Sequence, residues 1–395
     1  MLSALFKRSS IYLGGLTVSK LLSTLVFILF ARILLPQNFG NFVLFVTLLQ
    51  VVTFFADFGL IQWYQKQATI TDKNTLIGEV LFARLITLFI SIIISIFFLL
   101  ISKSFSNYIS ILFIISLVPE AFLSVIDGYY LELKQSFRVS LKTTVRMVLI
   151  FAGYLVFYNA FSFVSAIKLY LLSSIITLLW YFPWLKFKYF SSSNFSKSFQ
   201  TLNSSKLYAF LIFTSFTYSR GDSLVVRYTL NSTALGLYAA AYRFLESLSL
   251  IPTALAHNLF PISAKEGNVI KSQLMKIVLI MSLLGLVTAF LVFIFSSRLI
   301  TFILGNAYSA AIPLLKVFSL VIFLFFINSP LNTIVLSSSQ INKFLTYGVG
   351  NTLLNIALNI IFVPLFGVTA AAWVMLTTEI TGFVINVYFA RQVYS

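Results

Sequence analysis

Long apolar segments alternate with short polar ones along the whole chain. Twelve of them reach the roughly 20 residues that an α-helix needs to cross the hydrocarbon core of a bilayer. These segments are residues 10–31, 40–61, 77–101, 107–131, 141–159, 163–183, 207–230, 236–262, 274–296, 311–336, 344–364 and 368–390. The pattern predicts an all-α integral membrane protein with about twelve transmembrane helices.

The longest polar interruption, residues 184–206, follows the sixth apolar segment and is rich in Ser, Lys and Asn. It predicts two six-helix lobes, 1–183 and 207–395, joined by a cytoplasmic linker. The lobes also resemble each other, because residues 32–42 and 227–238 follow the first apolar segment of each lobe with a similar pattern. With an even number of helices per lobe, both lobes would insert in the same orientation, as parallel repeats.

The composition agrees with a membrane protein. Hydrophobic residues make up 59% of the chain and charged residues 9%, whereas soluble domains carry about a quarter charged residues. Such a chain could not keep a globular surface wet, which excludes a soluble globule. Cysteine is absent, which excludes disulfide bonds, thiolate metal sites and cysteine nucleophiles.

The net charge of +17 is a topology signal. With the N-terminus placed inside, sixteen Lys and Arg residues fall in inner segments, and only Arg32, Lys103 and Arg298 fall in outer loops. Because cytoplasmic loops carry an excess of Lys and Arg, we predict that both termini are cytoplasmic. The membrane topology then accounts for most of the positive charge, so the charge does not indicate nucleic acid binding. The sequence contains no P-loop, the motif that would indicate ATP binding and hydrolysis.

Ionisable residues inside the apolar segments are functional candidates, because a charge in mid-membrane costs about 2.5–3.5 kcal/mol on insertion scales. The candidate cations for binding an anionic substrate are Lys20, Arg84, Arg220, Arg227 and Arg243. The candidate acids for coupling to an ion are Asp222, Glu246, Glu120 and Asp127. We expect no catalytic residue, metal site or cofactor.

Spacing predicts how some of these charges are arranged. Arg220 and Arg227 are seven residues apart and share one helix face. Arg243 and Glu246 are three apart and can pair across one turn, and Asp222 lies at a depth where it could reach Arg243. A structural ion pair between two helices is the alternative to a substrate-binding role.

Other charged residues are expected to have structural roles. Arg146, Lys168, Lys316 and Glu79 lie near the ends of apolar segments, where their side chains can extend to the membrane interface. Asp57 is expected to cap the backbone where the second segment ends.

Several segments resemble a known family. Residues 36–42, followed by 56–60 (Ala-Asp-Phe-Gly-Leu), are similar to the start of the polysaccharide biosynthesis proteins, which include flippases for O-antigen and capsule repeat units. Residues 221–243 resemble the seventh and eighth helices of that family. Residues 303–315 and 355–367 complete a resemblance that covers nearly the whole chain.

The resemblance implies a place in the multidrug/oligosaccharidyl-lipid/polysaccharide (MATE-like) exporter superfamily, with alternating access and no enzymatic activity. The implied substrate is an undecaprenyl-diphosphate-linked oligosaccharide, moved from the inner to the outer leaflet of the bacterial plasma membrane. In related flippases, arginines of a central cationic cavity are thought to hold the diphosphate. The resemblance implies that Arg243 and Lys20 belong to such a cavity. Arg84, Arg220 and Arg227 are added from depth and charge alone.

Two other functions stay open. A MATE-like multidrug or small-molecule exporter would favour an acidic cavity for cationic drugs. A membrane polymerase or transferase of polysaccharide biosynthesis would need a sizeable outer loop or a His/Asp constellation, and the chain has one histidine. We expect a monomer whose partners are the lipid-linked glycan, membrane lipid and, for a flippase, a polysaccharide polymerase and glycosyltransferases.

Overall fold

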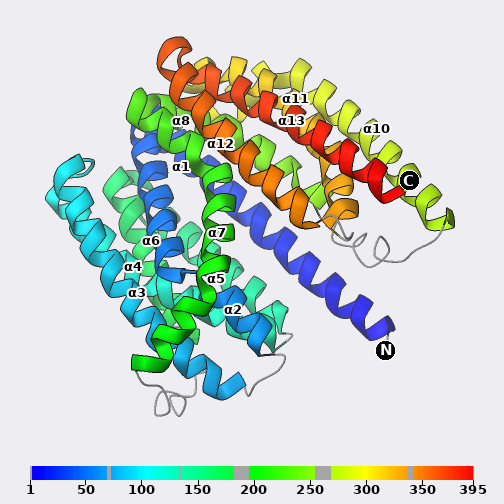
Figure 1. The fold of residues 1–395 in the computed structure, drawn as a ribbon. Coiled ribbons are helices and arrows are strands. Elements are labelled where there is room, and N and C mark those ends of the chain that lie inside the picture. Colours follow the sequence, from blue (N-terminus) through cyan, green and yellow to red (C-terminus); the bar gives the residue numbers. More distant parts are fainter. Residues whose placement is uncertain are drawn as a thin grey trace. The chain divides into compact units, whose positions relative to one another are not determined.

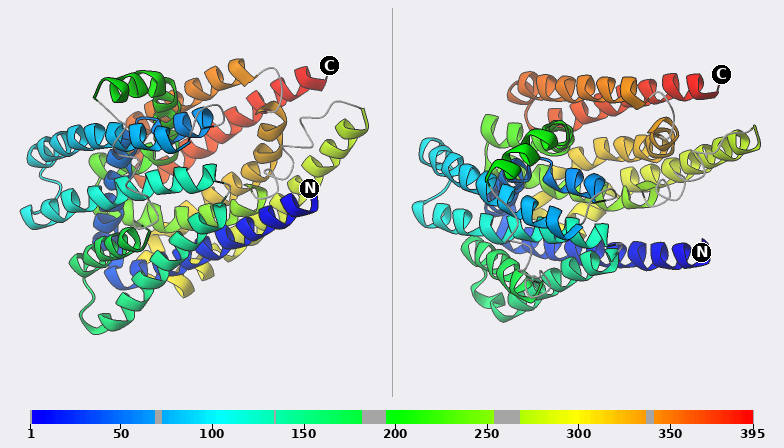
Figure 2. Two further views of the ribbon diagram at one scale, coloured as in Figure 1. Left: turned by 90° about the horizontal axis from the view of Figure 1, so that it is seen from below. Right: turned by 60° about the horizontal axis from the view of Figure 1, so that its bottom comes forward.

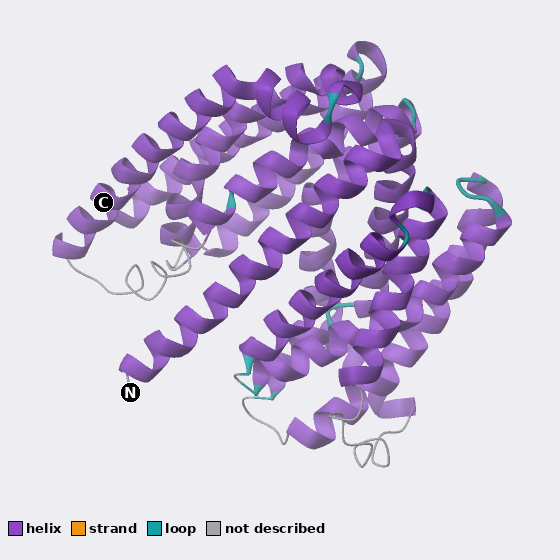
Figure 3. Cartoon of the chain, turned by 180° about the vertical axis from the view of Figure 1, so that it is seen from behind, coloured by secondary structure: helices purple, strands orange, loops and turns teal. Residues whose placement is uncertain are grey.

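The computed structural model describes residues 2–68, 73–133, 135–181, 195–253, 268–336 and 341–394. Every regular element in these ranges is a helix, and short loops join one helix to the next (Figure 1, Figure 3). The all-α fold expected from the sequence is therefore confirmed.

The helices form two compact units. Unit 1 comprises residues 1–26 and 45–216, and unit 2 comprises residues 27–44 and 217–395. Residues 27–44 thus group with the C-terminal helices. These units do not coincide with the two expected lobes, whose boundaries stay a prediction.

Unit 1 is arranged around α4 (Asn107–Glu132), which packs against α2, α3, α5 and α6. Phe113 of α4 meets Phe45 edge to face, with ring centroids 5.5 Å apart. Because α4 is enclosed by other helices, its charged residues need partners inside the protein. The elements of this unit are α2 (Leu60–Gln67), α3 (Lys73–Ser102), α5 (Ser136–Val156), η1 (Tyr158–Ala160), α6 (Phe163–Tyr181) and the first part of α7 (Phe195–Thr229).

Unit 2 is arranged around α11 (Ile312–Leu336), which packs against α8, α10 and α13. Helices α12 and α13 lie side by side (Figure 1, Figure 2). A π-helix, Ile300–Leu304, and a 3-10 helix, Asn306–Ala311, connect α10 to α11. The other helices are α8 (Ser232–Leu248), α10 (Asn268–Leu299), α12 (Ile341–Phe366) and α13 (Val368–Tyr394).

The long α1 (Leu2–Asp57) consists of two helices that meet at a corner. Leu35 at the corner has φ 60° and ψ 166°, and Pro36 follows it. Proline disfavours a helical conformation in the residue before it, so the helix breaks here. The first two expected segments, 10–31 and 40–61, therefore lie on separate helices.

Among the described residues, nine helices are long and apolar enough to cross a membrane. One of them is α1, which holds two of the expected segments. The expected segment 207–230 lies on the more polar α7, and the first part of segment 236–262 lies on α8. Residues 254–262 of the latter segment lie outside the described ranges. The number of twelve crossings stays a prediction.

The structure differs from the expected linker at 184–206. Helix α7 already begins at Phe195, so the second half of that segment is helical. Phe195, Phe199 and Leu202 recur at helical spacing, and neither Gly nor Pro interrupts them. Residues 184–194 lie outside the described ranges.

Candidate functional site

Two arginines share one carboxylate in unit 2. Glu246 of α8 accepts a hydrogen bond of 2.7 Å from Arg243, one turn earlier, and lies 3.7 Å from Arg220 of α7. The side chains of Arg220 and Arg243 remain 28% and 12% exposed, so an incoming ligand can reach them. The pairing of Arg243 with Glu246 is confirmed. The cluster of Arg220, Arg243 and Glu246 carries one positive charge in excess.

Aromatic rings lie against both guanidinium groups. The guanidinium carbon of Arg243 is 4.8 Å from the ring centroid of Phe27, and that of Arg220 is 5.9 Å from the ring of Tyr242. Such contacts hold a planar guanidinium by its face and leave its N–H edges for acceptors. Each of the two arginines therefore contacts an aromatic ring in addition to Glu246.

Arg227 lies on the same face of α7 as Arg220, two turns further along. Its guanidinium is 5.9 Å from the ring of Tyr228, and its Nε is buried without a hydrogen-bond partner among the described residues. Arg227 thus has hydrogen-bonding capacity to spare in unit 2.

Asp222 of α7 is enclosed between α7 and α8. Its carboxylate accepts a hydrogen bond from the hydroxyl of Tyr238 and one of 2.6 Å from the backbone N–H of Ser223. The acceptor contacts that the structure gives this acid are therefore with Tyr238 and Ser223, whereas the sequence suggested Arg243. This arrangement joins α7 to α8.

Glu379 of α13 is an acid inside an apolar segment that the sequence did not single out as a coupling candidate. Its carboxylate accepts hydrogen bonds of 2.5 Å from the hydroxyl of Tyr218 and 2.9 Å from the amide of Asn328. No described Lys or Arg forms an ion pair with it. The signal in the sequence is an acid at mid-segment without a nearby base, but its partners on α7 and α11 are far away along the chain.

In unit 1, Arg84 is fully buried inside the helical packing. It pairs with Asp57 at 3.2 Å and also donates to the hydroxyl of Ser124 at 2.5 Å and the carbonyl of Ala121 at 3.2 Å. An arginine with 0% exposure and three protein acceptors joins α1, α3 and α4. Asp57 is therefore an ion-pair partner in addition to any capping role.

The two candidate acids of α4, Glu120 and Asp127, are both paired with cations of α5. Glu120 receives two hydrogen bonds from Arg146 and one of 2.8 Å from Ser174, and Asp127 receives one from Lys142. The expectation that Arg146 is an interfacial anchor is wrong. Its position near a helix end did not reveal that a neighbouring helix supplies a carboxylate.

Lys20 of α1 is half-buried in unit 1. The preceding residue, Ser19, donates to the carbonyl of Ser140 at 3.0 Å, and its hydroxyl lies 2.7 Å from that of Thr144. This part of α1 therefore packs against the polar side of α5. The structure brings together Arg220 and Arg243, with Arg227 on the same helix, while Lys20 and Arg84 belong to unit 1.

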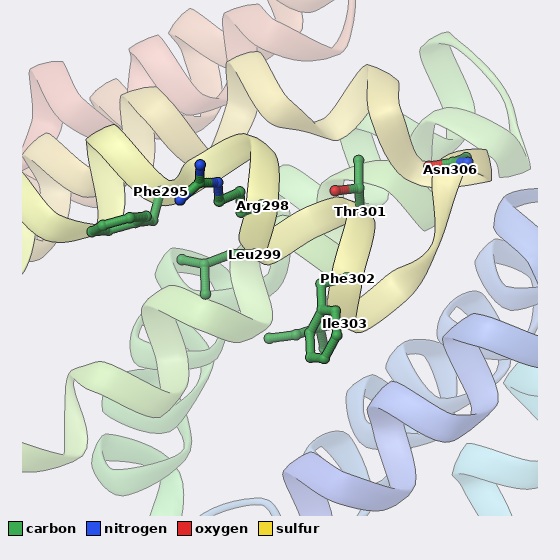
Figure 4. Close-up of a pocket in the computed structure, with 7 residues that line it drawn as sticks. All are labelled: Phe295, Arg298, Leu299, Thr301, Phe302, Ile303 and Asn306. Carbon is green, nitrogen blue, oxygen red and sulfur yellow. The ribbon is translucent and has the colours of Figure 1, made fainter.

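Unit 2 also contains a cavity of about 510 Å³ at the end of α10 (Figure 4). Arg298, Thr301 and Asn306 supply its polar groups, and apolar side chains including Phe295 and Phe302 supply the rest. None of the candidate cations or acids lines it. Within the described ranges, no cluster of His, Asp and Glu could hold a metal ion.

A sequence model of the polysaccharide biosynthesis protein family matches residues 29–313. The chain belongs to this family. The expected family resemblance is thereby confirmed. No curated protein sequence matches this polysaccharide biosynthesis protein.

Solved structures of membrane transporters share its fold. An inward-facing multidrug resistance MATE family transporter of the MOP superfamily matches with a TM-score of 0.70 at 15% identity, over 98% of this chain and 99% of that one. The lipid II flippase MurJ, in an inward closed conformation, matches with a TM-score of 0.72 at 15% identity, over 98% and 87%. A MOP superfamily transporter from Pyrococcus furiosus matches with a TM-score of 0.58 at 14% identity, over 98% and 96%. The chain therefore has the fold of these transporters, and its long apolar helices make it a multi-pass membrane protein.

Proposed function

We propose that this protein is a flippase that moves an undecaprenyl-diphosphate-linked oligosaccharide from the inner to the outer leaflet of the bacterial plasma membrane. The cargo would be an O-antigen, capsule or similar repeat unit. One observation carries the proposal: in a polysaccharide biosynthesis protein, Arg220 and Arg243 share the single carboxylate of Glu246. We also propose that the chain crosses the membrane twelve times, with both termini in the cytoplasm. Transport would occur by alternating access between two six-helix lobes.

A diphosphate suits this cluster chemically. It carries about two negative charges, and guanidinium groups bind phosphate oxygens through paired, charge-assisted hydrogen bonds. These contacts strengthen where water is excluded. The excess positive charge of the cluster would attract the diphosphate, and Arg227, with its unpartnered Nε, would extend the cationic surface along α7.

Glu246 is the coupling acid that the geometry favours. The other candidates have different partners: Asp222 has Tyr238, Glu120 has Arg146 and Asp127 has Lys142. Only Glu246 holds two arginines that we assign to substrate. Substrate phosphate and the Glu246 carboxylate would compete for the same N–H groups, so protonation of Glu246 would favour loading.

The test is to measure flipping of a fluorescent undecaprenyl-diphosphate oligosaccharide by the reconstituted protein and surface glycan in cells. We expect Arg243→Gln to abolish both signals while the protein still inserts normally. Arg298→Gln, which removes an arginine outside the cluster in the same unit, should retain both. Wild-type flipping by Arg243→Gln would exclude the cationic-cluster mechanism.

A MATE-like multidrug exporter is the second candidate, favoured by one observation. Glu379 is a buried acid that no described Lys or Arg neutralises, and such an acid suits a cationic substrate. Drug efflux that depends on Glu379 but not on Arg243 would support this function. Neighbouring genes for glycosyltransferases and a polymerase would support the flippase.

A further inference from the structure

A groove of about 260 Å³ lies in unit 1 between the end of α1 and the first part of α7. Lys206 of α7 is the one charged residue among those that line it. Six phenylalanines form most of its walls: Phe54, Phe55, Phe58, Phe210, Phe213 and Phe216. The groove is thus aromatic along its length and cationic at one place.

Close packing fixes the two walls. Phe54 lies 4.8 Å from Phe216, and Phe55 lies 5.6 Å from Phe213, between ring centroids. At the corner after α1, Gly59 has φ 73°, and a Cβ there would lie 2.4 Å from the backbone nitrogen of Ala209. Only glycine allows α7 to approach this corner so closely. Close packing of α7 on the corner at Gly59 therefore positions the walls of the groove.

The aromatic walls are open to the surroundings. Five of the phenylalanines remain between 38% and 53% exposed, although their rings also pack on one another. Lys206 is exposed as well, and it donates a 3.1 Å hydrogen bond to the side chain of Asn203, one turn earlier. In the proposed topology Lys206 lies at the inner surface, so the groove leads from the inner leaflet to an ammonium group at the interface.

We propose that this groove binds a polyprenyl phosphate, with its first isoprene units against the phenylalanines and its phosphate at Lys206. The proposal rests on the proposed function, because the lipid-linked cargo has the same prenyl chain with a phosphate attached to it. Apolar walls and a terminal cation match an apolar chain that ends in an anion. The groove would hold the carrier lipid in the inner leaflet before the diphosphate reaches the arginines of unit 2.

The experiment is a titration of the full-length protein, in phosphatidylcholine nanodiscs, with undecaprenyl phosphate, followed by native mass spectrometry. Lys206→Gln removes a charge-assisted contact and should weaken binding at least about fivefold. The double variant Phe210→Ala/Phe213→Ala should weaken it similarly. Melting curves check that each variant is folded.

Two matched controls belong to the titration. Lys197→Gln removes another exposed lysine of α7, and Phe97→Ala removes an exposed phenylalanine of α3 that lines no described pocket. Both should bind within about twofold of the wild type. Wild-type binding by the groove variants, or equal displacement by phosphatidylglycerol, would overturn the proposal. If the wild type binds undecaprenyl phosphate through the groove yet flips no lipid-linked glycan, the proposed function is wrong, whereas lipid binding by the groove is still supported.

Discussion

Gly40 and Gly236 face each other where α1 crosses α8 in unit 2. A Cβ on Gly40 would lie 1.7 Å from the carbonyl oxygen of Ser232, and one on Gly236 would lie 2.0 Å from that of Pro36. Each glycine makes room for the backbone of the other helix, as small residues do at close helix crossings in membranes. Gly40 and Gly236 lie in residues 32–42 and 227–238, the two segments whose similar pattern predicts that the lobes are repeats.

Filling this crossing should destabilise the protein. Gly236→Val would push a side chain into the backbone of α1, at a cost of at least about 2 kcal/mol. We expect a lower melting temperature of the purified protein than for the wild type. Gly348→Ala is the control, because no atom lies within 4 Å of a Cβ there and alanine favours a helix. If Gly236→Val and the wild type melt at the same temperature, then close contact between α1 and α8 does not contribute to the stability of the protein.

The same crossing offers a test of alternating access. The hydroxyl of Ser232 donates a 2.5 Å hydrogen bond to the side chain of Asn41, and the chain contains no cysteine. We therefore expect Asn41→Cys/Ser232→Cys to form a disulfide on oxidation. If α1 and α8 must part here during transport, oxidation should stop flipping and a reductant should restore it. Each single cysteine variant, treated in the same way, should keep flipping. Undiminished flipping by the cross-linked protein would rule out movement at this crossing.

How much of this could be predicted from the sequence depends on distance along the chain. The apolar segments predict the helices, and the pair Arg243–Glu246 follows from a spacing of three residues. The pairs of Arg84 with Asp57 and of Arg146 with Glu120 bridge 27 and 26 residues. Apolar segments do not specify which helices are neighbours, so such partners become visible only in the folded chain.

Breaking the buried pair of Arg84 and Asp57 should impair folding. Asp57→Asn would leave the Arg84 guanidinium buried without its counter-charge, which typically costs about 3–5 kcal/mol. We expect a low yield and a low melting temperature. The double variant Asp57→Leu/Arg84→Met removes both charges and should recover much of the loss.

The control for this pair is Arg391→Gln, which removes an exposed arginine near the end of α13. It should melt like the wild type. Wild-type stability of Asp57→Asn would show that Ser124 and Ala121 suffice to hold Arg84, and that the ion pair contributes little.

Neutralising Glu246 should separate substrate binding from transport. The Glu246 carboxylate holds Arg243 at 2.7 Å and Arg220 at 3.7 Å, and a substrate diphosphate would compete for the same groups. Glu246→Gln removes the competing charge, so the purified protein should bind undecaprenyl diphosphate more tightly. We expect a Kd about tenfold lower, which corresponds to about 1.4 kcal/mol of binding free energy. Flipping should slow and lose its dependence on pH, because no carboxylate remains to displace the product.

The matched control is Glu79→Gln, which neutralises a half-buried acid of unit 1 outside the cluster. Its binding and flipping should stay close to those of the wild type. If Glu246→Gln instead weakens binding as Arg243→Gln does, then Glu246 positions the two arginines and does not compete with substrate. Binding titrations at two pH values decide between these roles, because competition by Glu246 weakens as the carboxylate is protonated, whereas positioning fails under the same condition.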